Sequence, residues 1–95
     1  MNKGQVMCFE VKLSHGVEKK IRKCPQDVQA SLVALIEDLR ADGPEQPAWP
    51  NYSRLKDGYH CHLKHKWVAC WRSEKGTITI EVYYVGSRES APYAR

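Results

Sequence analysis

The sequence predicts an α+β fold in which two N-terminal helices pack on one face of a largely antiparallel, four- to five-stranded sheet. Three observations support this: a length of only 95 residues, one long amphipathic segment, and a C-terminal half of short alternating segments separated by turn signals. A chain of this length has room for one core, so we expect a single domain over residues 1–95.

The N-terminal half begins with a strand pattern and a short helix pattern. Residues 6–13 mix β-branched and aromatic side chains and partly alternate with polar neighbours, as in a half-buried strand. Ser14 is a candidate N-cap, and a short helix is expected from there to about Lys23. Pro25 cannot continue that helix without strain.

A longer helix is expected to begin near Pro25, whose ring suits a first turn, and to end at the sequence Asp42-Gly43-Pro44. Its apolar residues recur at helical spacing and form a single stripe: Val28, Leu32, Leu35, Ile36 and Leu39. The two helices are therefore expected to cover one side of the sheet.

The C-terminal half reads as a loop followed by a meander. Residues 44–50 contain three prolines, which block regular structure, and Trp49 is expected to anchor this loop to the body. Candidate strands then follow at residues 52–55, 59–64, 67–72 and 77–85. The order β-α-α-β-β-β-β with hairpin-length connections implies a largely antiparallel sheet.

Charge and cysteine content narrow the class of protein. The formal net charge is +4, which favours a polyanionic partner but is also common in proteins that bind none. We expect a cytoplasmic protein without a membrane segment, because no signal peptide and no run of eighteen apolar residues is present. The four cysteines show no CxxC spacing and are expected to be reduced and mostly buried.

The candidate strand at residues 59–64 places chemistry on one face. Side chains on a strand alternate, so Tyr59, Cys61 and Leu63 point one way, and His60, His62 and Lys64 point the other. Grouped imidazoles can transfer protons at neutral pH, although a solvated strand face without chemistry fits the same pattern. We expect no metal and no cofactor, because alternation puts Cys61 on the wrong face and a structural zinc needs four ligands.

Two residues of the C-terminal tail are further candidates. Arg88 follows the last strand and could hold a phosphate through its fork of donors, or could simply pair with Glu89. Tyr93 could stack on a base or donate a hydrogen bond to a phosphate.

The order of elements, the run YHCHL at residues 59–63 and the ending YVGSRE at residues 84–89 resemble the RelE/ParE toxin superfamily over nearly the whole chain. The resemblance implies the toxin of a toxin-antitoxin system: a ribosome-dependent mRNA endonuclease (mRNA interferase) that represses translation and whose antitoxin is a separate chain. Cleavage would proceed by attack of a ribose 2′-hydroxyl on the adjacent phosphate, without a metal.

The resemblance also implies roles for individual residues. The catalytic set would be His60, His62, Arg88 and Tyr93. The RNA- or phosphate-binding set would be Arg54, Lys56, Lys64, Lys66 and Arg72. The two histidines occupy positions where RelE-like enzymes carry lysines, and Val68 stands where they have another phosphate-binding arginine. Two alternatives stay open: a ParE-like toxin that poisons DNA gyrase, and a nuclease-dead relative that binds RNA or an antitoxin.

Overall fold

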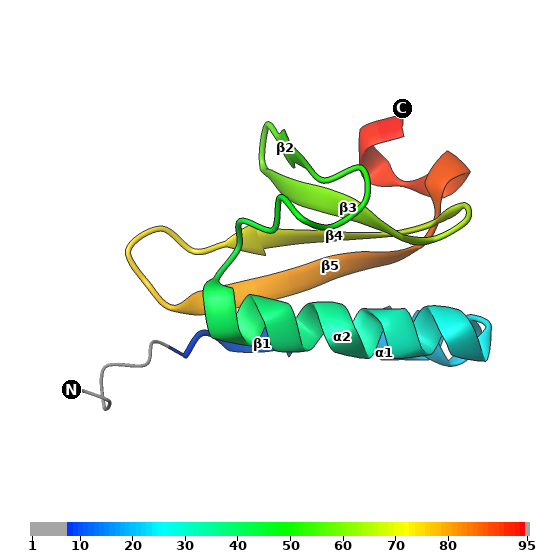
Figure 1. Ribbon diagram of the computed structural model, residues 1–95, viewed down its shortest axis with the longest axis horizontal. Helices are drawn as coiled ribbons and strands as arrows, with labels where there is room; N and C mark the ends of the chain where they lie inside the picture. The colour runs from blue at the N-terminus through cyan, green and yellow to red at the C-terminus, as the bar shows by residue number, and fades with distance from the viewer. Residues whose placement is uncertain (1–7, 95) are drawn as a thin grey trace.

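The computed structural model describes residues 8–94, which form one five-stranded sheet and two α-helices (Figure 1). The elements in chain order are β1 (Glu10–Leu13), α1 (Val17–Arg22), α2 (Gln26–Asp42), β2 (Ser53–Leu55), β3 (Gly58–Lys64), β4 (Trp67–Ser73) and β5 (Thr79–Ser87). Two short 3₁₀ helices follow, η2 (Arg88–Ser90) and η3 (Pro92–Ala94). The predicted order of elements and the α+β class are confirmed.

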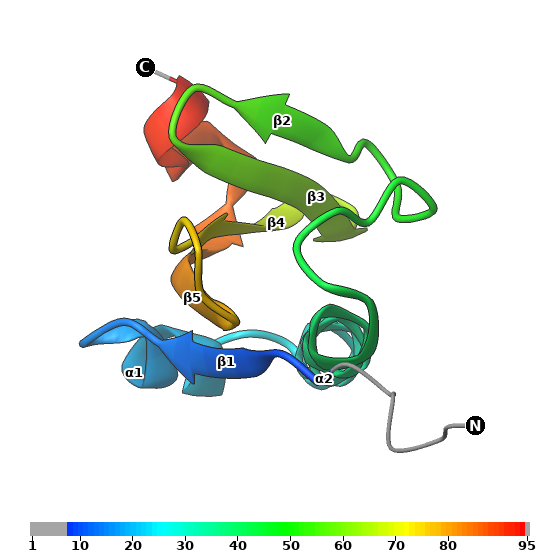
Figure 2. The same cartoon turned by 90° about the vertical axis from the view of Figure 1, so that its left-hand side faces the viewer.

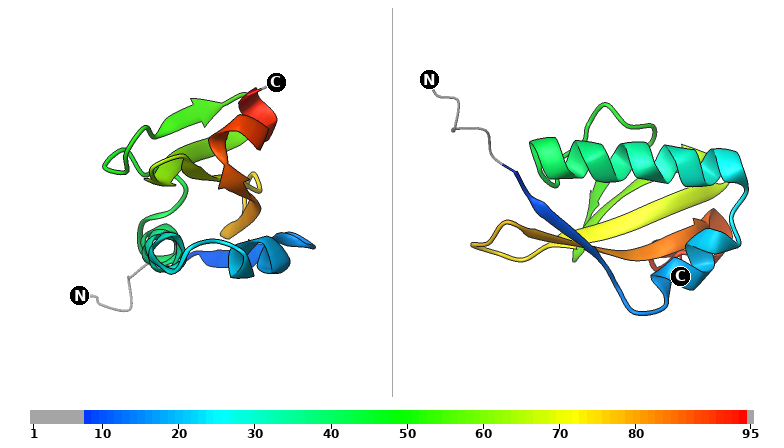
Figure 3. Two further views of the ribbon diagram at one scale, coloured as in Figure 1. Left: turned by 90° about the vertical axis from the view of Figure 1, so that its right-hand side faces the viewer. Right: turned by 90° about the horizontal axis from the view of Figure 1, so that it is seen from below.

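The strands lie in the order β1-β5-β4-β3-β2. The pairs β2–β3, β3–β4 and β4–β5 are antiparallel, whereas β1 is parallel to β5, with Glu10 opposite Thr79 and Leu13 opposite Val82. The sheet is therefore largely antiparallel with one parallel pair at its edge. Both helices lie on one face of this sheet, and the C-terminal segment lies away from them (Figures 2 and 3).

The start of the chain differs from the prediction in two ways. The predicted first strand began at Val6, but residues 6 and 7 lie outside the described residues and β1 begins only at Glu10. Ser14 is not the N-cap of α1; Gly16 is, in the left-handed conformation at φ 88°. The Ser14 hydroxyl instead donates a hydrogen bond to Glu81 of β5, so it ties the end of β1 to the sheet.

Helix α2 supplies most of the helical part of the core. Four residues of its predicted stripe are buried, with Val28, Leu32, Leu35 and Leu39 each at most 2% exposed, while Ile36 is partly buried. The helix ends before Gly43 as expected. These side chains meet a layer from β3, β4 and β5 that consists of Cys61, Leu63, Ala69, Trp71, Ile80, Val82 and Val85. No helix among residues 8–94 is long and apolar enough to cross a membrane.

The proline-rich loop is anchored as predicted. The Trp49 indole donates a hydrogen bond to the Asp38 carboxylate at 2.8 Å, and the indole also packs against the core. Gln46 is buried in the same loop and donates to the carbonyl oxygens of Asp38 and Gly43. The loop is thus tied to the C-terminal end of α2 and brings the chain to β2 at the far edge of the sheet.

Truncation of the α2 stripe should test this core. Leu39→Ala removes a side chain that is 0% exposed, and we expect it to lower the free energy of unfolding by about 2–5 kcal/mol. Val33→Ala on the same helix removes a side chain that is 58% exposed and should change it by less than about 0.5 kcal/mol. Urea unfolding of both variants measures the difference; equal effects would contradict the burial of the stripe.

Candidate functional site

Strand β3 separates apolar from polar side chains in the way that alternation predicts. Cys61 and Leu63 join the core on the helix-bearing face, while His60 and His62 lie on the opposite face with their ring centroids 6.1 Å apart. We call this opposite face the histidine face. The register of the β3–β4 pair sets His60 opposite Cys70 and His62 opposite Val68.

His60 is the more enclosed of the two histidines. It is 8% exposed, because the ring of Tyr93 lies against it with the ring centroids 4.2 Å apart. The Ser53 hydroxyl on the neighbouring strand β2 lies 3.2 Å from His60 Nδ1, and the antiparallel register places these two residues directly opposite each other. His60 is therefore held between a hydroxyl on one side and an aromatic ring on another.

Ser53 was not identified from the sequence. A serine that begins a three-residue strand carries no signal of its own. Only the β2–β3 register, which pairs Ser53 with His60, shows that it can orient the imidazole.

Arg88 reaches the site from the end of β5. Its backbone N–H donates to the carbonyl oxygen of Lys66 at 2.6 Å, which fixes the start of the C-terminal segment to the β3–β4 turn. Just before it, the Tyr84 hydroxyl donates to the carbonyl oxygen of Ser87 at 2.7 Å. A Cβ atom at Gly86 would lie only 2.7 Å from that hydroxyl, so this glycine allows the close approach that shapes the chain entering Arg88.

The pKa values of both histidines are lowered. Burial lowers the pKa of His60 most and the nearby His62 lowers it further, while a hydrogen bond with Ser53 acts in the opposite direction. Burial also lowers the pKa of His62, and the positive charge of Arg88 adds to this effect. Since an ordinary histidine titrates near pH 6.5, both imidazoles are neutral at pH 7 and able to accept a proton.

These shifts also make stability depend on pH. A histidine whose pKa is lower in the folded than in the unfolded state binds more protons when unfolded. Its contribution to stability is therefore fully present above the unfolded pKa near 6.5 and is lost as the pH falls through the folded value.

Tyr93 carries a polar group in an unusual setting. Its hydroxyl is buried and has no hydrogen-bond partner among residues 8–94. Burial raises the pKa of Tyr93, and the nearby Cys70 raises it further, so the phenol keeps its proton at neutral pH. The site thus contains a protonated hydroxyl, unpaired among the described residues, on a ring that lies against His60 and near Arg88.

The floor of the histidine face is apolar. Val68 and Cys70 are both 0% exposed, and burial raises the pKa of the Cys70 thiol to about 12. Ala91, in the C-terminal segment, is also 0% exposed. No cation therefore stands at position 68, where the family resemblance implied one.

The five predicted phosphate-binding cations do not lie on one face of the sheet. Two of them lie away from the histidines. Lys64 follows a register shift between His62 and Lys64 that breaks the alternation, and its ammonium lies 3.9 Å from Asp27 of α2, on the helix-bearing side. Arg54 pairs with Tyr59 and its guanidinium lies 5.7 Å from that ring, so it too is on the helix-bearing face. The prediction that Lys64 points to the same side as His60 and His62 is therefore wrong.

The other three are closer to the histidine face. Lys66 is exposed in the turn that binds the Arg88 backbone. Arg72 lies over the ring of Tyr83 at 4.1 Å and 3.9 Å from the Glu81 carboxylate. Lys56 lines a hollow of about 220 Å³ together with Tyr83, Pro92 and Tyr93. Of these three cations, Lys56 is therefore the one that shares a cavity with Tyr93.

The arrangement is suited to acid-base chemistry on an anion. His60 and His62 come from the single strand β3, and Arg88 and Tyr93 come from the C-terminal segment. Neutral imidazoles, a cation and a protonated phenol thus meet on one face. Among residues 8–94 no group of three or more His, Cys, Asp or Glu side chains is placed to hold a metal ion. The three described cysteines with buried side chains, Cys24, Cys61 and Cys70, are free thiols, and Cys8 is free and exposed.

The charge of Arg88 should be measurable at His62. Arg88→Ala removes a nearby positive charge, so the pKa of His62 should rise while that of His60 changes less. Proton NMR titration of the imidazole C–H signals from pH 5 to pH 8 (roughly the range over which histidine titrates) reports both values. Arg22→Ala, which removes an equivalent charge from the end of α1, should leave both unchanged. Equal shifts in the two variants would place Arg88 away from His62.

Tyr93→Phe should not destabilise the protein. The substitution removes a buried hydroxyl without a partner among the described residues and keeps the ring against His60. Since an unsatisfied buried polar group costs about 1–3 kcal/mol, we expect equal or higher stability in thermal unfolding. A clear loss of stability would show that the hydroxyl has a structural partner.

Comparison with known proteins identifies solved structures that have the same fold. No protein-family profile and no curated protein matches the sequence. Solved structures do match. The archaeal RelE–RelB complex from Pyrococcus horikoshii contains a chain that is 16% identical, with 90% of this chain and 100% of that chain covered, at a TM-score of 0.74.

Two further structures agree. A mutant of the Escherichia coli toxin RelE in the free state is 15% identical, with 93% of this chain and 90% of that chain covered and a TM-score of 0.69. A chain of the YoeB–YefM complex from Staphylococcus aureus is 10% identical, with 81% of this chain and 93% of that chain covered and a TM-score of 0.63. At these identities the likeness is one of structure alone, and the chain shares the fold of these RelE and YoeB structures.

Proposed function

We propose that this chain is the toxin of a toxin-antitoxin system and a metal-independent endoribonuclease that cuts messenger RNA on the ribosome. The observation that carries the proposal is the cluster of His60, His62, Arg88 and Tyr93 on the face of a RelE-like fold that the helices leave free. Residues 1–95 would form one toxin domain that acts in the cytoplasm.

Each residue has a role that follows from its surroundings. His62 is neutral, is more exposed than His60 and lies near Arg88, so it takes the proton from the ribose 2′-hydroxyl. The 2′-oxygen then forms a bond to the adjacent phosphorus, and Arg88 stabilises the negative charge of the crowded phosphorane. As the bond from phosphorus to the 5′-oxygen breaks, Tyr93 gives its proton to the leaving oxygen, which requires the C-terminal segment to move so that the buried hydroxyl meets the RNA.

His60 acts through Tyr93 in this scheme. Its ring is 8% exposed and lies against the tyrosine, so it positions Tyr93 rather than contacting RNA itself. Lys56, Lys66 and Arg72 are exposed cations on or beside the histidine face and would bind phosphates of the strand.

A partner antitoxin is part of the proposal. Two of the similar structures are complexes, RelE with RelB and YoeB with YefM. We therefore expect a separate antitoxin chain, encoded in an adjacent reading frame, that covers the cationic site.

A nuclease-dead relative that still binds RNA or an antitoxin is the second candidate. Two observations favour it: Val68 puts no charge on the floor of the site, and His60 is almost fully covered. Cleavage activity separates the two candidates directly.

Cleavage of a translated messenger in a reconstituted translation system, with ends mapped by primer extension, tests the proposal. His62→Ala, Arg88→Ala and Tyr93→Phe should each lower the cleavage rate about a hundredfold or more, a typical loss when acid-base catalysis or charge stabilisation is removed. His60→Ala should also reduce it, and His15→Ala, at an exposed histidine outside the cluster, should not.

Codon-phased cuts that depend on these residues would support the nuclease. An absence of cuts by well-folded wild-type protein would overturn it in favour of the nuclease-dead relative, and gyrase inhibition would be measured next. Cuts that persist in Arg88→Ala and His62→Ala would place the active site elsewhere.

A further inference from the structure

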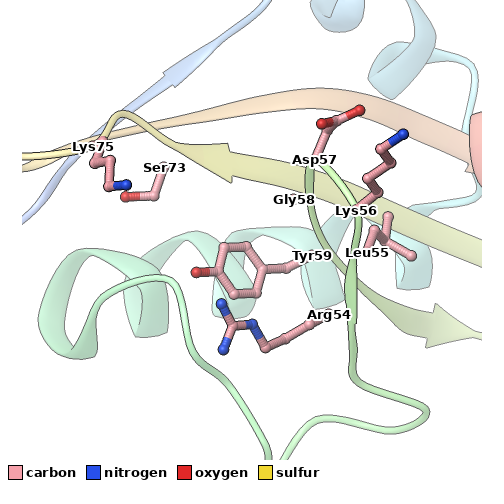
Figure 4. Close-up of a pocket in the computed structure, with 8 residues that line it drawn as sticks. All are labelled: Arg54, Leu55, Lys56, Asp57, Gly58, Tyr59, Ser73 and Lys75. Atoms are coloured by element: carbon pink, nitrogen blue, oxygen red, sulfur yellow. The ribbon is translucent and has the colours of Figure 1, made fainter.

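A second hollow lies beside the β2–β3 turn (Figure 4). Its volume is about 450 Å³, and it is lined by Arg54, Leu55, Lys56, Asp57, Gly58, Tyr59, Ser73 and Lys75. Gly58 has to be a glycine here, because a Cβ atom would lie 2.4 Å from the Trp71 carbonyl oxygen. The close pairing of β3 with β4 at this point therefore forms one wall of the hollow.

The hollow is cationic. Arg54, Lys56 and Lys75 contribute three positive charges against the single carboxylate of Asp57. Within residues 8–94 no carboxylate lies within 4.0 Å of these three cations, whereas Lys12, Lys64 and Arg72 each have one within that distance. These charges are therefore available to a ligand of opposite sign.

The hollow also has an aromatic wall. The Tyr59 ring packs in a triangular cluster with those of Tyr52 and Trp71, with the three ring centroids 6.0 to 6.4 Å apart. The Arg54 guanidinium lies 5.7 Å from the Tyr59 centroid, within the range of a cation–π contact. Aromatic rings and guanidinium planes are the surfaces on which the bases of single-stranded nucleic acids stack.

This hollow shares part of its lining with a cavity beside the histidine face. Leu55, Lys56 and Asp57 line both it and the smaller hollow that reaches Tyr93. In Figure 4 the side chains of Lys56 and Asp57 point to one side of the turn, and those of Arg54 and Tyr59 lie together on the other. A strand that passes Tyr93 and bends around this turn would meet Lys56 first and then Arg54 and Lys75.

We propose that this hollow binds a nucleotide of single-stranded RNA that flanks the nucleotides at the histidine face. Its base stacks against Arg54 and Tyr59, and the phosphates contact Lys75 and Lys56. The inference rests on the proposed function for the identity of the polymer, but it assigns Arg54 a role outside the catalytic cluster.

The test measures binding without cleavage. The probe is a fluorescent ten-nucleotide RNA with 2′-O-methyl riboses, which lacks the attacking hydroxyl, and fluorescence anisotropy gives the Kd at several salt concentrations. The variant Arg54→Ala/Lys75→Ala loses two exposed cations from the hollow. The control Arg22→Ala/Arg40→Ala loses two exposed cations from α1 and α2, outside it.

We expect the hollow variant to bind the ten-nucleotide RNA at least about tenfold more weakly than the control variant. The slope of log K against log salt should become shallower by about 0.7, since Lys75 is the one phosphate contact that this variant loses and each contact to a single strand contributes roughly that amount. A three-nucleotide probe, too short to reach both sites, should bind the two variants equally. Arg54→Lys keeps the positive charge but loses the planar guanidinium group. This variant should bind the ten-nucleotide RNA less tightly than the wild-type protein does.

Three results would overturn the inference. The first is that the hollow variant and the control variant bind the ten-nucleotide RNA equally. The second is that the hollow variant loses as much affinity for the three-nucleotide probe as for the ten-nucleotide RNA. The third is that an acidic peptide competes at a lower concentration than RNA does, which would assign the hollow to a protein partner. The binding test does not depend on cleavage. If the protein cuts no RNA but its RNA binding depends on Arg54, the flanking site is supported and only the proposed nuclease activity is overturned.

Discussion

The antiparallel pairing of β3 with β4 is the constraint on which the rest of the molecule depends. It sets Cys61 opposite Ala69 on the face that α2 covers, and His62 opposite Val68 on the other. A shift of one residue in this register would exchange the two faces, burying imidazoles against the helices and exposing the core. The tight contact at Gly58, where a larger residue would meet the Trp71 carbonyl, holds the pair at one end.

The C-terminal segment depends on this sheet in turn. It is attached where the Arg88 N–H meets the Lys66 carbonyl, and Tyr93 then rests on His60. Part of the histidine face is therefore covered, which explains why Val68 and Cys70 are apolar although they share a face with two histidines. A charged side chain at position 68 would lose its hydration unless the segment moved away.

The sequence was sufficient to predict the elements, their order and the separation of the two faces, because these follow from local periodicity. It was also sufficient to group His60 with His62. It did not predict where Lys64 and Arg54 lie. Lys64 follows a register irregularity, and Arg54 lies on a strand of three residues whose facing is set by its pairing with Tyr59.

The same limit explains the residues that sequence reasoning missed or misassigned. Ser53 becomes a partner of His60 only through the β2–β3 register. Ser14 has the chemistry of an N-cap, but its hydroxyl donates to Glu81, which is brought near by the parallel β1–β5 pair. Both contacts join segments far apart in the sequence, and no local pattern records them.

His60 and His62 lie on the same face of β3, but they differ in exposure to solvent. The difference arises because other residues cover His60. His60 is held by Ser53 and Tyr93 and is almost without solvent contact, so a proton placed on it would be poorly hydrated. His62 keeps contact with solvent, and its pKa responds to Arg88. In the mechanism that we propose, a group that meets both solvent and the arginine takes the proton from a substrate bound by Arg88. The covered histidine would then support Tyr93, so the packing of the tail would be part of the site's chemistry.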